Sequence, residues 1–250
     1  MPLKSFQRGK RTLATTDASQ KIVTGKVEEY RSSSYFATKV QDPYITFKYY
    51  RYGASMGPTR FYWHDISAGT LTELTVVSSN GSTYNTGFSG QHHTDYGQTW
   101  LTGTINLATY ETTGYGRFVV RHVTIDSQSY YAGDFQMDHI EIHTAVGDTI
   151  NLDPDLYRQN TNDKFWQRST SFDTAWSTTH AWTDVSYGTD ASALWNYGAG
   201  GTGSGSTGDT VNSDGSGSEY YLYTEVSGAA NRYSYLQTKY QYDLFSGASQ

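Results

Sequence analysis

The feature that most constrains the fold is a succession of short segments in which apolar and polar residues alternate, separated by glycine-rich turns. Alternation with a period of two is typical of a β-strand that has one buried face and one wet face. Many short strands of this kind, without a helical stretch between them, predict a β-sandwich. The segments with the clearest pattern are residues 44–52, 59–64, 71–77, 100–107, 116–123 and 133–143, with a turn at 79–81.

The pattern weakens in the second part of the chain, where glycine, serine and threonine become frequent. Residues 198–217 are nearly all of these three types, which predicts a long flexible loop. Two further strands are expected at residues 219–226 and 233–245. The predicted organisation is an extended arm over residues 1–25 and one sandwich over 26–250, with a first half at 26–145, a polar connection at 146–165 and a second half at 166–250.

Composition excludes several classes of protein. The 250 residues include no cysteine, so neither a disulfide framework nor a thiolate metal site can form. The formal net charge of -6, at a charged fraction of 17%, is not the footprint of a nucleic-acid-binding protein, which needs a clustered basic face. No apolar run is long enough for a membrane-spanning helix, and the basic residues near Met1 are not followed by the apolar stretch of a signal peptide. We therefore expect no nucleic-acid partner and no membrane.

Two stretches of the chain resemble MAM domains, the adhesion modules of receptor phosphatases, neuropilins and meprins. The aromatic strand Phe47–Gly53 with the turn Met56-Gly57 is similar to the family's aromatic strand and Met-Gly turn. The segment Tyr130–Ile140, with its Gly133-Asp134 pair, is similar to the glycine–aspartate strand that follows in the family, and Trp100 stands between the two. The resemblance implies an all-β, two-sheet antiparallel jelly-roll sandwich.

The half that opens a MAM domain stands downstream in this chain. It is represented by Trp195, Gly208-Asp209-Thr210, the strand Tyr220–Ser227 and the segment Arg232–Thr238. Either the jelly roll is circularly permuted, or the second half completes the sandwich of a neighbouring subunit. The chain also lacks the family's disulfides and secretory leader. These departures fit a module that folds inside a host cell and is used outside it, of which a bacteriophage or other virion protein is the simplest case.

The resemblance implies that four acidic residues approach one another when the two halves join: Asp134, Asp138, Asp209 and Glu225. Some related jelly rolls hold a calcium or sodium ion in such a place, and hard cations need several oxygen ligands at once. The other interpretation is that Asp134 and Asp209 are turn residues that hydrogen-bond the neighbouring backbone. A bound Ca²⁺ therefore stands as one alternative, and no cofactor is required.

No pattern in the chain predicts catalysis. There is no cysteine nucleophile and no nucleophile elbow between a strand and a helix. The adjacent His92 and His93 are expected to be loop or surface residues, because neighbours on an extended chain point to opposite faces. His64 and His122 are expected to be hydrogen-bonded strand residues. The chain is therefore predicted not to be an enzyme.

The expected function is that of a virion structural protein, in a tail, fibre or capsid surface, that is assembled in the host cytoplasm. Its partners would be other virion proteins and copies of itself; the alternative is a carbohydrate-binding module that recognises a host glycan. Tyrosine suits both interpretations, since its large apolar body carries a polar tip and the chain has 23 of them. The residues predicted to bind partners are Lys4, Arg8, Lys10, Arg11, Tyr30, Tyr35, Tyr130 and Tyr131.

Overall fold

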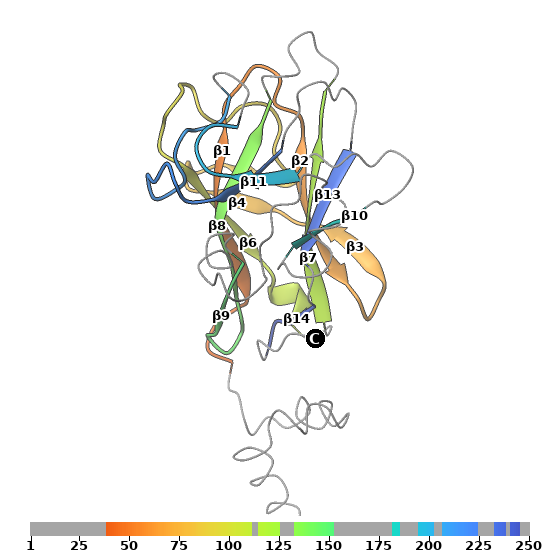
Figure 1. Cartoon of the computed structure of the whole chain (residues 1–250). Coiled ribbons are helices and arrows are strands. Elements are labelled where there is room, and N and C mark those ends of the chain that lie inside the picture. The colour runs from red at the N-terminus through yellow and green to blue at the C-terminus, as the bar shows by residue number, and fades with distance from the viewer. Residues whose placement is uncertain are drawn as a thin grey trace, which may run out of the picture. The chain divides into compact units, whose positions relative to one another are not determined.

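The computed structural model describes residues 39–111, 115–125, 133–152, 182–185, 195–202, 207–224, 233–238 and 241–245. These residues form β-strands, loops and one short 3₁₀ turn, η1 (Ala108–Tyr110), and include no α-helix (Figure 1). No helix that could cross a membrane occurs in these ranges. The predicted arm over residues 1–25 lies outside the described residues.

The strands form two antiparallel sheets that pack as a sandwich, which confirms the predicted fold class. Sheet A has the strand order β11-β12-β8-β1-β6-β4-β5, with β9 beside β8, and sheet B has the order β10-β13-β7-β2-β3, with β14 beside β7. The strands of sheet A are β1 (Tyr44–Arg51), β4 (Val76–Ser78), β5 (Thr83–Tyr84), β6 (Leu101–Asn106), β8 (Phe135–His143), β9 (Thr149–Asn151), β11 (Trp195–Gly198) and β12 (Tyr221–Thr224). Those of sheet B are β2 (Thr59–Asp65), β3 (Thr70–Glu73), β7 (Tyr115–Val123), β10 (Trp182–Val185), β13 (Tyr233–Thr238) and β14 (Tyr242–Asp243).

The core lies between the two sheets and is built by the alternation that the sequence shows. Phe47 and Tyr49 of β1 meet Phe61 of β2 and Phe118 of β7, and all four side chains are fully buried. Aromatic rings fill the centre, with Phe61 and Phe118 stacked at 6.1 Å between ring centroids. Burial of these large apolar faces supplies the main stabilisation of the sandwich.

Two glycines let the chain pack more closely than any other residue would allow. A Cβ atom at Gly57 would lie 1.7 Å from the carbonyl oxygen of Val123, so the turn after β1 can pass β7 only as glycine. A Cβ atom at Gly116 would lie 2.1 Å from the ring of Trp63, which packs flat against the backbone of β7. The Met56-Gly57 turn therefore has a steric cause.

The second half of the chain completes both sheets within the same chain. Strand β12 pairs with β8 through Leu222 and Met137, and β11 continues the sheet beyond β12. Strand β13 pairs with β7, with Leu236 opposite Val120. Of the two arrangements that the sequence left open, the structure has the one in which the halves join inside one chain.

The structure corrects two of the predicted segments. Residues 71–77 were expected to form one strand, but β3 belongs to sheet B and β4 to sheet A, and the chain crosses between the sheets at Leu74 and Thr75. Leu74 enters the core at this crossing, and its N–H group donates to the carbonyl oxygen of Phe61 at 2.8 Å. The connection predicted at 146–165 is not entirely irregular either, because it begins with β9, which pairs with β8.

Candidate functional site

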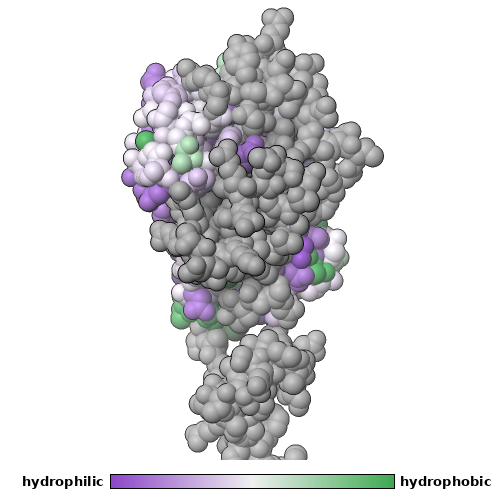
Figure 2. Space-filling view, in the orientation of Figure 1, coloured by the Kyte–Doolittle hydropathy of each residue, from purple (hydrophilic) through white to green (hydrophobic). Residues whose placement is uncertain are grey.

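A loop of the second half lies against the outer face of β8. We call residues 199–220 the covering loop, of which 199–202 and 207–220 are described; it is drawn in blue beside β8 in Figure 1. Figure 2 shows the surface at the upper left as mostly pale, the colour of weakly polar residues, as expected for glycine, serine and threonine. The described part of 198–217 is a loop after the end of β11, as predicted, and side-chain hydrogen bonds anchor it to the sheet.

Gln136 of β8 makes the central anchor of the covering loop. Its side-chain oxygen accepts a hydrogen bond from the Asp209 N–H at 2.6 Å, and its amide nitrogen donates to the Asp209 carbonyl oxygen at 3.1 Å. Both residues are buried, so the pair satisfies polar groups that water cannot reach. Gly208 is required beside this anchor, since a Cβ atom there would lie 2.4 Å from Thr202.

Three of the four acidic residues that the sequence assigned to one candidate site lie on or beside β8 and the covering loop, each with its own hydrogen-bond donors. The buried Asp134 accepts hydrogen bonds from the hydroxyls of Thr202 and Thr207, at 2.6 and 3.1 Å. Asp209 accepts from the indole N–H of Trp100 at 3.1 Å. Asp138 accepts from the backbone N–H groups of His139 and Ser213, both at 2.9 Å, and its burial raises its pKa.

These carboxylates are therefore held by neutral donors of the chain. No group of three or more histidine, aspartate and glutamate side chains within the described ranges is arranged to hold a metal ion. Glu225, the fourth predicted ligand, lies outside the described residues. The bound cation stays a prediction, while the hydrogen bonds show that Asp134, Asp138 and Asp209 join the covering loop to the sheet.

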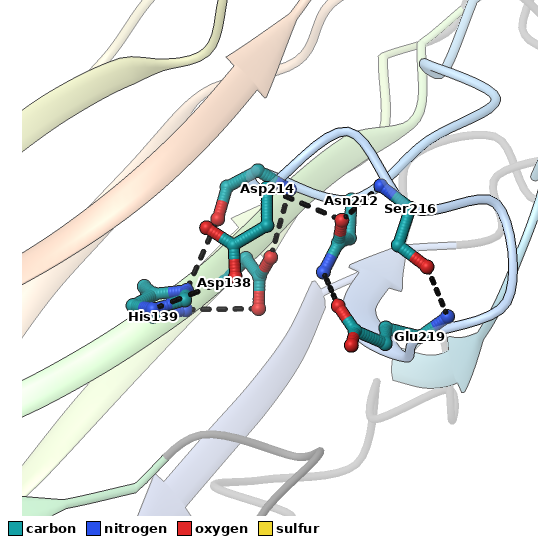
Figure 3. A network of polar contacts seen from close by, with 7 residues as sticks. Asp138, His139, Asn212, Asp214, Ser216 and Glu219 are labelled. Atoms are coloured by element: carbon teal, nitrogen blue, oxygen red, sulfur yellow. Dashed lines mark hydrogen bonds and ion pairs between the residues drawn. The ribbon is translucent and has the colours of Figure 1, made fainter.

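A polar network continues from Asp138 along the covering loop (Figure 3). His139 has a φ of 47°, which places its backbone in the left-handed region at a β-bulge, where the register between β1 and β8 slips. Its ring lies 3.1 Å from the Ser213 hydroxyl and 3.9 Å from the Asp214 carboxylate. Further along, Asn212 donates to Glu219 at 2.8 Å. The bulge thus turns a side chain of β8 toward the loop that covers it.

A second cluster of aromatic rings lies on the outer side of sheet A, beside the covering loop. It consists of Tyr50, Trp100 and Tyr221, all buried, with the rings of Tyr50 and Trp100 5.9 Å apart. The hydroxyl of Tyr221 donates to the carbonyl oxygens of Gly200 and Asp209, and burial raises the pKa of this phenol above its usual range. The cluster therefore gives the loop an apolar support as well as polar anchors.

The interior of the sandwich contains a guanidinium group that the sequence did not reveal. Arg51, at the end of β1, is fully buried, and its guanidinium lies between the rings of Phe88 and Phe135, at 5.6 and 5.5 Å from their centroids. It donates to the Thr59 hydroxyl and to the carbonyl oxygens of Gly57 and Gly90, at 2.6, 2.8 and 3.0 Å. Burial lowers its pKa to about 9, so it stays charged at neutral pH.

Three histidines surround this buried cation. His122 is fully buried and shares a 2.9 Å hydrogen bond with Thr59, and the backbone N–H groups of His92 and His93 both donate to the Arg51 carbonyl oxygen. Burial, with Arg51 nearby, lowers the pKa values of His92 and His122 to about 3, and burial lowers the pKa of His93 as well. The expectation for His122 is confirmed, and His92 and His93 lie in a loop, as one of the expected alternatives has it, although His93 is buried.

The outer face of sheet B is different in character. Arg60, Arg117 and Arg121 alternate with the core residues of β2 and β7 and so point away from the core, and we call these three residues the arginine face. Arg121 lies between two tyrosine rings, 5.9 Å from the centroid of Tyr62 and 5.7 Å from that of Tyr233. Arginine and tyrosine are the residue types that protein interfaces favour.

The residues that sequence reasoning predicted to bind partners all lie outside the described residues: Lys4, Arg8, Lys10, Arg11, Tyr30, Tyr35, Tyr130 and Tyr131. The arginine face was missed, although the alternation in Thr59–Asp65 and Tyr115–Val123 contains the signal. In both segments, arginines occupy positions that alternate with the apolar core residues. Comparison with known proteins adds no relative, because no family model, curated protein or solved structure matches this chain.

Proposed function

We propose that the chain is a non-enzymatic assembly module that makes protein–protein contacts, as a structural component of a virion. The observation that carries the proposal is the arginine face, where arginines and tyrosines lie together on one flat sheet. Such a surface is suited to a protein partner, since these side chains combine large contact area with directional hydrogen bonds.

The hydrogen bonds of the acidic residues beside the covering loop support a structural role. Asp134, Asp138 and Asp209 accept hydrogen bonds from threonine, tryptophan and backbone donors of the same chain. A general acid or base needs instead to reach a substrate atom at hydrogen-bond distance. Groups that hold a loop in place are engaged already, and their arrangement favours stability over chemistry.

Two features support the placement in a virion: the resemblance to MAM domains and a composition without cysteine. The pairing of β12 with β8 fits a permuted jelly roll, the arrangement that the resemblance implies for a chain with exchanged halves. The absence of cysteine fits a protein that folds in a reducing compartment, such as the cytoplasm of a host cell.

Deletion of residues 1–24 tests the proposal. Residues 40–250 form a compact unit, so the truncated chain should keep the unfolding transition of the full chain while losing its ability to assemble. Sedimentation velocity of the two proteins, alone and with disassembled particles, measures the difference. Normal assembly of the truncated chain would show that the arm is not the docking element.

A carbohydrate-binding module is the second candidate function. One observation favours it: Tyr96, which is 45% exposed, lies 6.3 Å from Tyr52 between ring centroids, and aromatic faces of this kind can stack on sugars. A glycan array probed with the full chain, with and without a chelator, separates the candidates. Binding to a defined glycan that Tyr96→Ala abolishes would replace the assembly proposal.

A further inference from the structure

The arginine face contains like charges that the chain itself does not neutralise. Arg60 and Arg121 stand directly opposite each other on β2 and β7, and His64 stands opposite Arg117. Like charges at directly opposed positions of a sheet are destabilising. Across the described part of sheet B, the one ion pair of this face joins Arg60 to Glu73 at 3.1 Å, which leaves Arg117 and Arg121 without a carboxylate.

The arginines of this face have more N–H donors than the described part of the chain supplies acceptors for. The Nε–H groups of all three arginines are buried and make no hydrogen bond within the described ranges, so a partner would be bound through the terminal Nη groups. Arg60 is 37% exposed, and the Tyr233 ring that supports Arg121 is 40% exposed. An arginine fork binds a carboxylate through two parallel hydrogen bonds, so a protein surface rich in carboxylates is the chemical complement of this face.

The opposite side of the sandwich offers such a surface. Glu141 points outward from β8, while Asp214 and Glu219 lie on the covering loop, and the Asp214 side chain is 60% exposed. Glu141 and Asp214 approach His143 and His139, which neutralise them only when protonated. With a net charge of -6, the chain is acidic as a whole, and the arginine face is a positive region set against that charge.

We propose that the arginine face docks onto the carboxylates of Glu141, Asp214 and Glu219 of a second copy of this chain. This inference rests on the proposed assembly function and names its partner. The two surfaces lie on opposite sheets, so one contact uses the arginine face of one copy and the carboxylate face of the next. Two arginine faces would repel each other, which excludes a symmetric pair through this face. A head-to-tail contact leaves a free face at each end and generates rows of subunits.

Sedimentation velocity of the full-length chain at two salt concentrations tests the contact. We expect association at about 0.05 M salt and mostly monomer at about 1 M, where charges are screened beyond ~3 Å. The variant Arg117→Gln/Arg121→Gln should weaken association at least about tenfold at low salt. The matched control is Lys48→Gln, which removes a cation from the outer face of sheet A, where Lys48 donates to Thr102, and should not weaken association.

Two charge-reversal variants, one on each face, provide a second test. Because each variant should associate with the other, loss of association in either one alone cannot be explained by misfolding. Asp214→Arg, on an exposed loop, should abolish self-association, and so should Arg121→Glu. A mixture of the two proteins should associate again, because the intact arginine face of Asp214→Arg meets the intact carboxylates of Arg121→Glu. Wild-type association that persists in both variants, or a monomer at low salt, overturns the inference.

The outcomes separate this inference from the proposed function. If deletion of residues 1–24 abolishes assembly while Arg117→Gln/Arg121→Gln assembles normally, the assembly function stands and the arginine-face contact is wrong. If the arginine face binds an oligoglutamate peptide but not a second copy, the partner is a different acidic protein and the inference is wrong. If the chain is monomeric and binds a glycan, both proposals fail.

Discussion

The outer face of sheet A is covered by a loop of its own chain, whereas on the outer face of sheet B two arginines, Arg117 and Arg121, have no carboxylate partner among the described residues. On sheet A, Asp134, Gln136 and Asp138 each find a donor or acceptor in the covering loop. On sheet B, Arg60 and Arg121 face each other across neighbouring strands. Polar residues on the outer face of a sheet stabilise the fold when their hydrogen-bond and ion-pair partners belong to the same chain. Without such partners, they are available to bind another molecule.

The largest expected effect comes from removing the internal partners on sheet A. Asp134→Ala combined with Gln136→Leu removes the acceptors of the buried Thr202 hydroxyl and of the buried Asp209 N–H group. We expect the free energy of unfolding to fall by about 2–6 kcal/mol, since each of these two unsatisfied buried groups costs about 1–3 kcal/mol. Urea unfolding at neutral pH measures it. A loss below about 1 kcal/mol would break the comparison, because the loop would then not depend on these anchors.

An intermediate effect is expected between the sheets, where three histidines surround Arg51. Native His122 stays neutral down to its lowered pKa of about 3, whereas the unfolded chain takes up the proton near pH 6.5. Stability is therefore fully present above pH 6.5 and falls as the pH drops toward 3, by about 2 kcal/mol at pH 5 for this residue alone.

The pH dependence is checked by urea unfolding at pH 7 and pH 5 for the wild type and for His122→Asn. The variant should lose less stability between the two pH values than the wild type does, because it lacks this proton uptake on unfolding. Equal losses in the two proteins would mean that His122 does not contribute to the acid sensitivity of the fold.

The smallest expected effect is on sheet B. Arg117→Gln should change the free energy of unfolding by no more than about 0.5 kcal/mol, because no carboxylate of the described residues forms an ion pair with Arg117. Thermal unfolding of the variant and the wild type in parallel gives the comparison. A loss above about 1 kcal/mol would place Arg117 among the residues that serve the fold.

The central strands could be predicted from the sequence because their alternation is local information. Segments 44–52, 59–64 and 116–123 became β1, β2 and β7 with boundaries shifted by at most one residue. The crossing at Leu74 could not be predicted in this way, since Thr70–Glu73 and Val76–Ser78 together look like one strand. Membership of different sheets depends on distant partners, which are β2 for one piece and β6 for the other.

The candidate site was predicted in part. Joining the two halves does place Asp209 beside β8, but the carboxylates of Asp134, Asp138 and Asp209 each have separate donors, several of them in a segment of low complexity that offers many equivalent hydroxyls. One signal was present and unused: Met137 and Ile140 are both core residues, and the two polar residues between them break the alternation of β8. That break marks the β-bulge at His139.

The crossing between β3 and β4 also limits how this chain can vary in length. Leu74 and Val76 both face the core, one on each side of the step from sheet B to sheet A, while Val77 is 50% exposed. Insertion of a single residue between them would exchange the buried and exposed positions of β4. Val76 would then leave the core that it shares with the aromatic residues of β2. The connection between β3 and β4 therefore has a fixed length. Homologous chains should accept insertions in the turn at Ser79–Gly81 far more readily than between Leu74 and Val76.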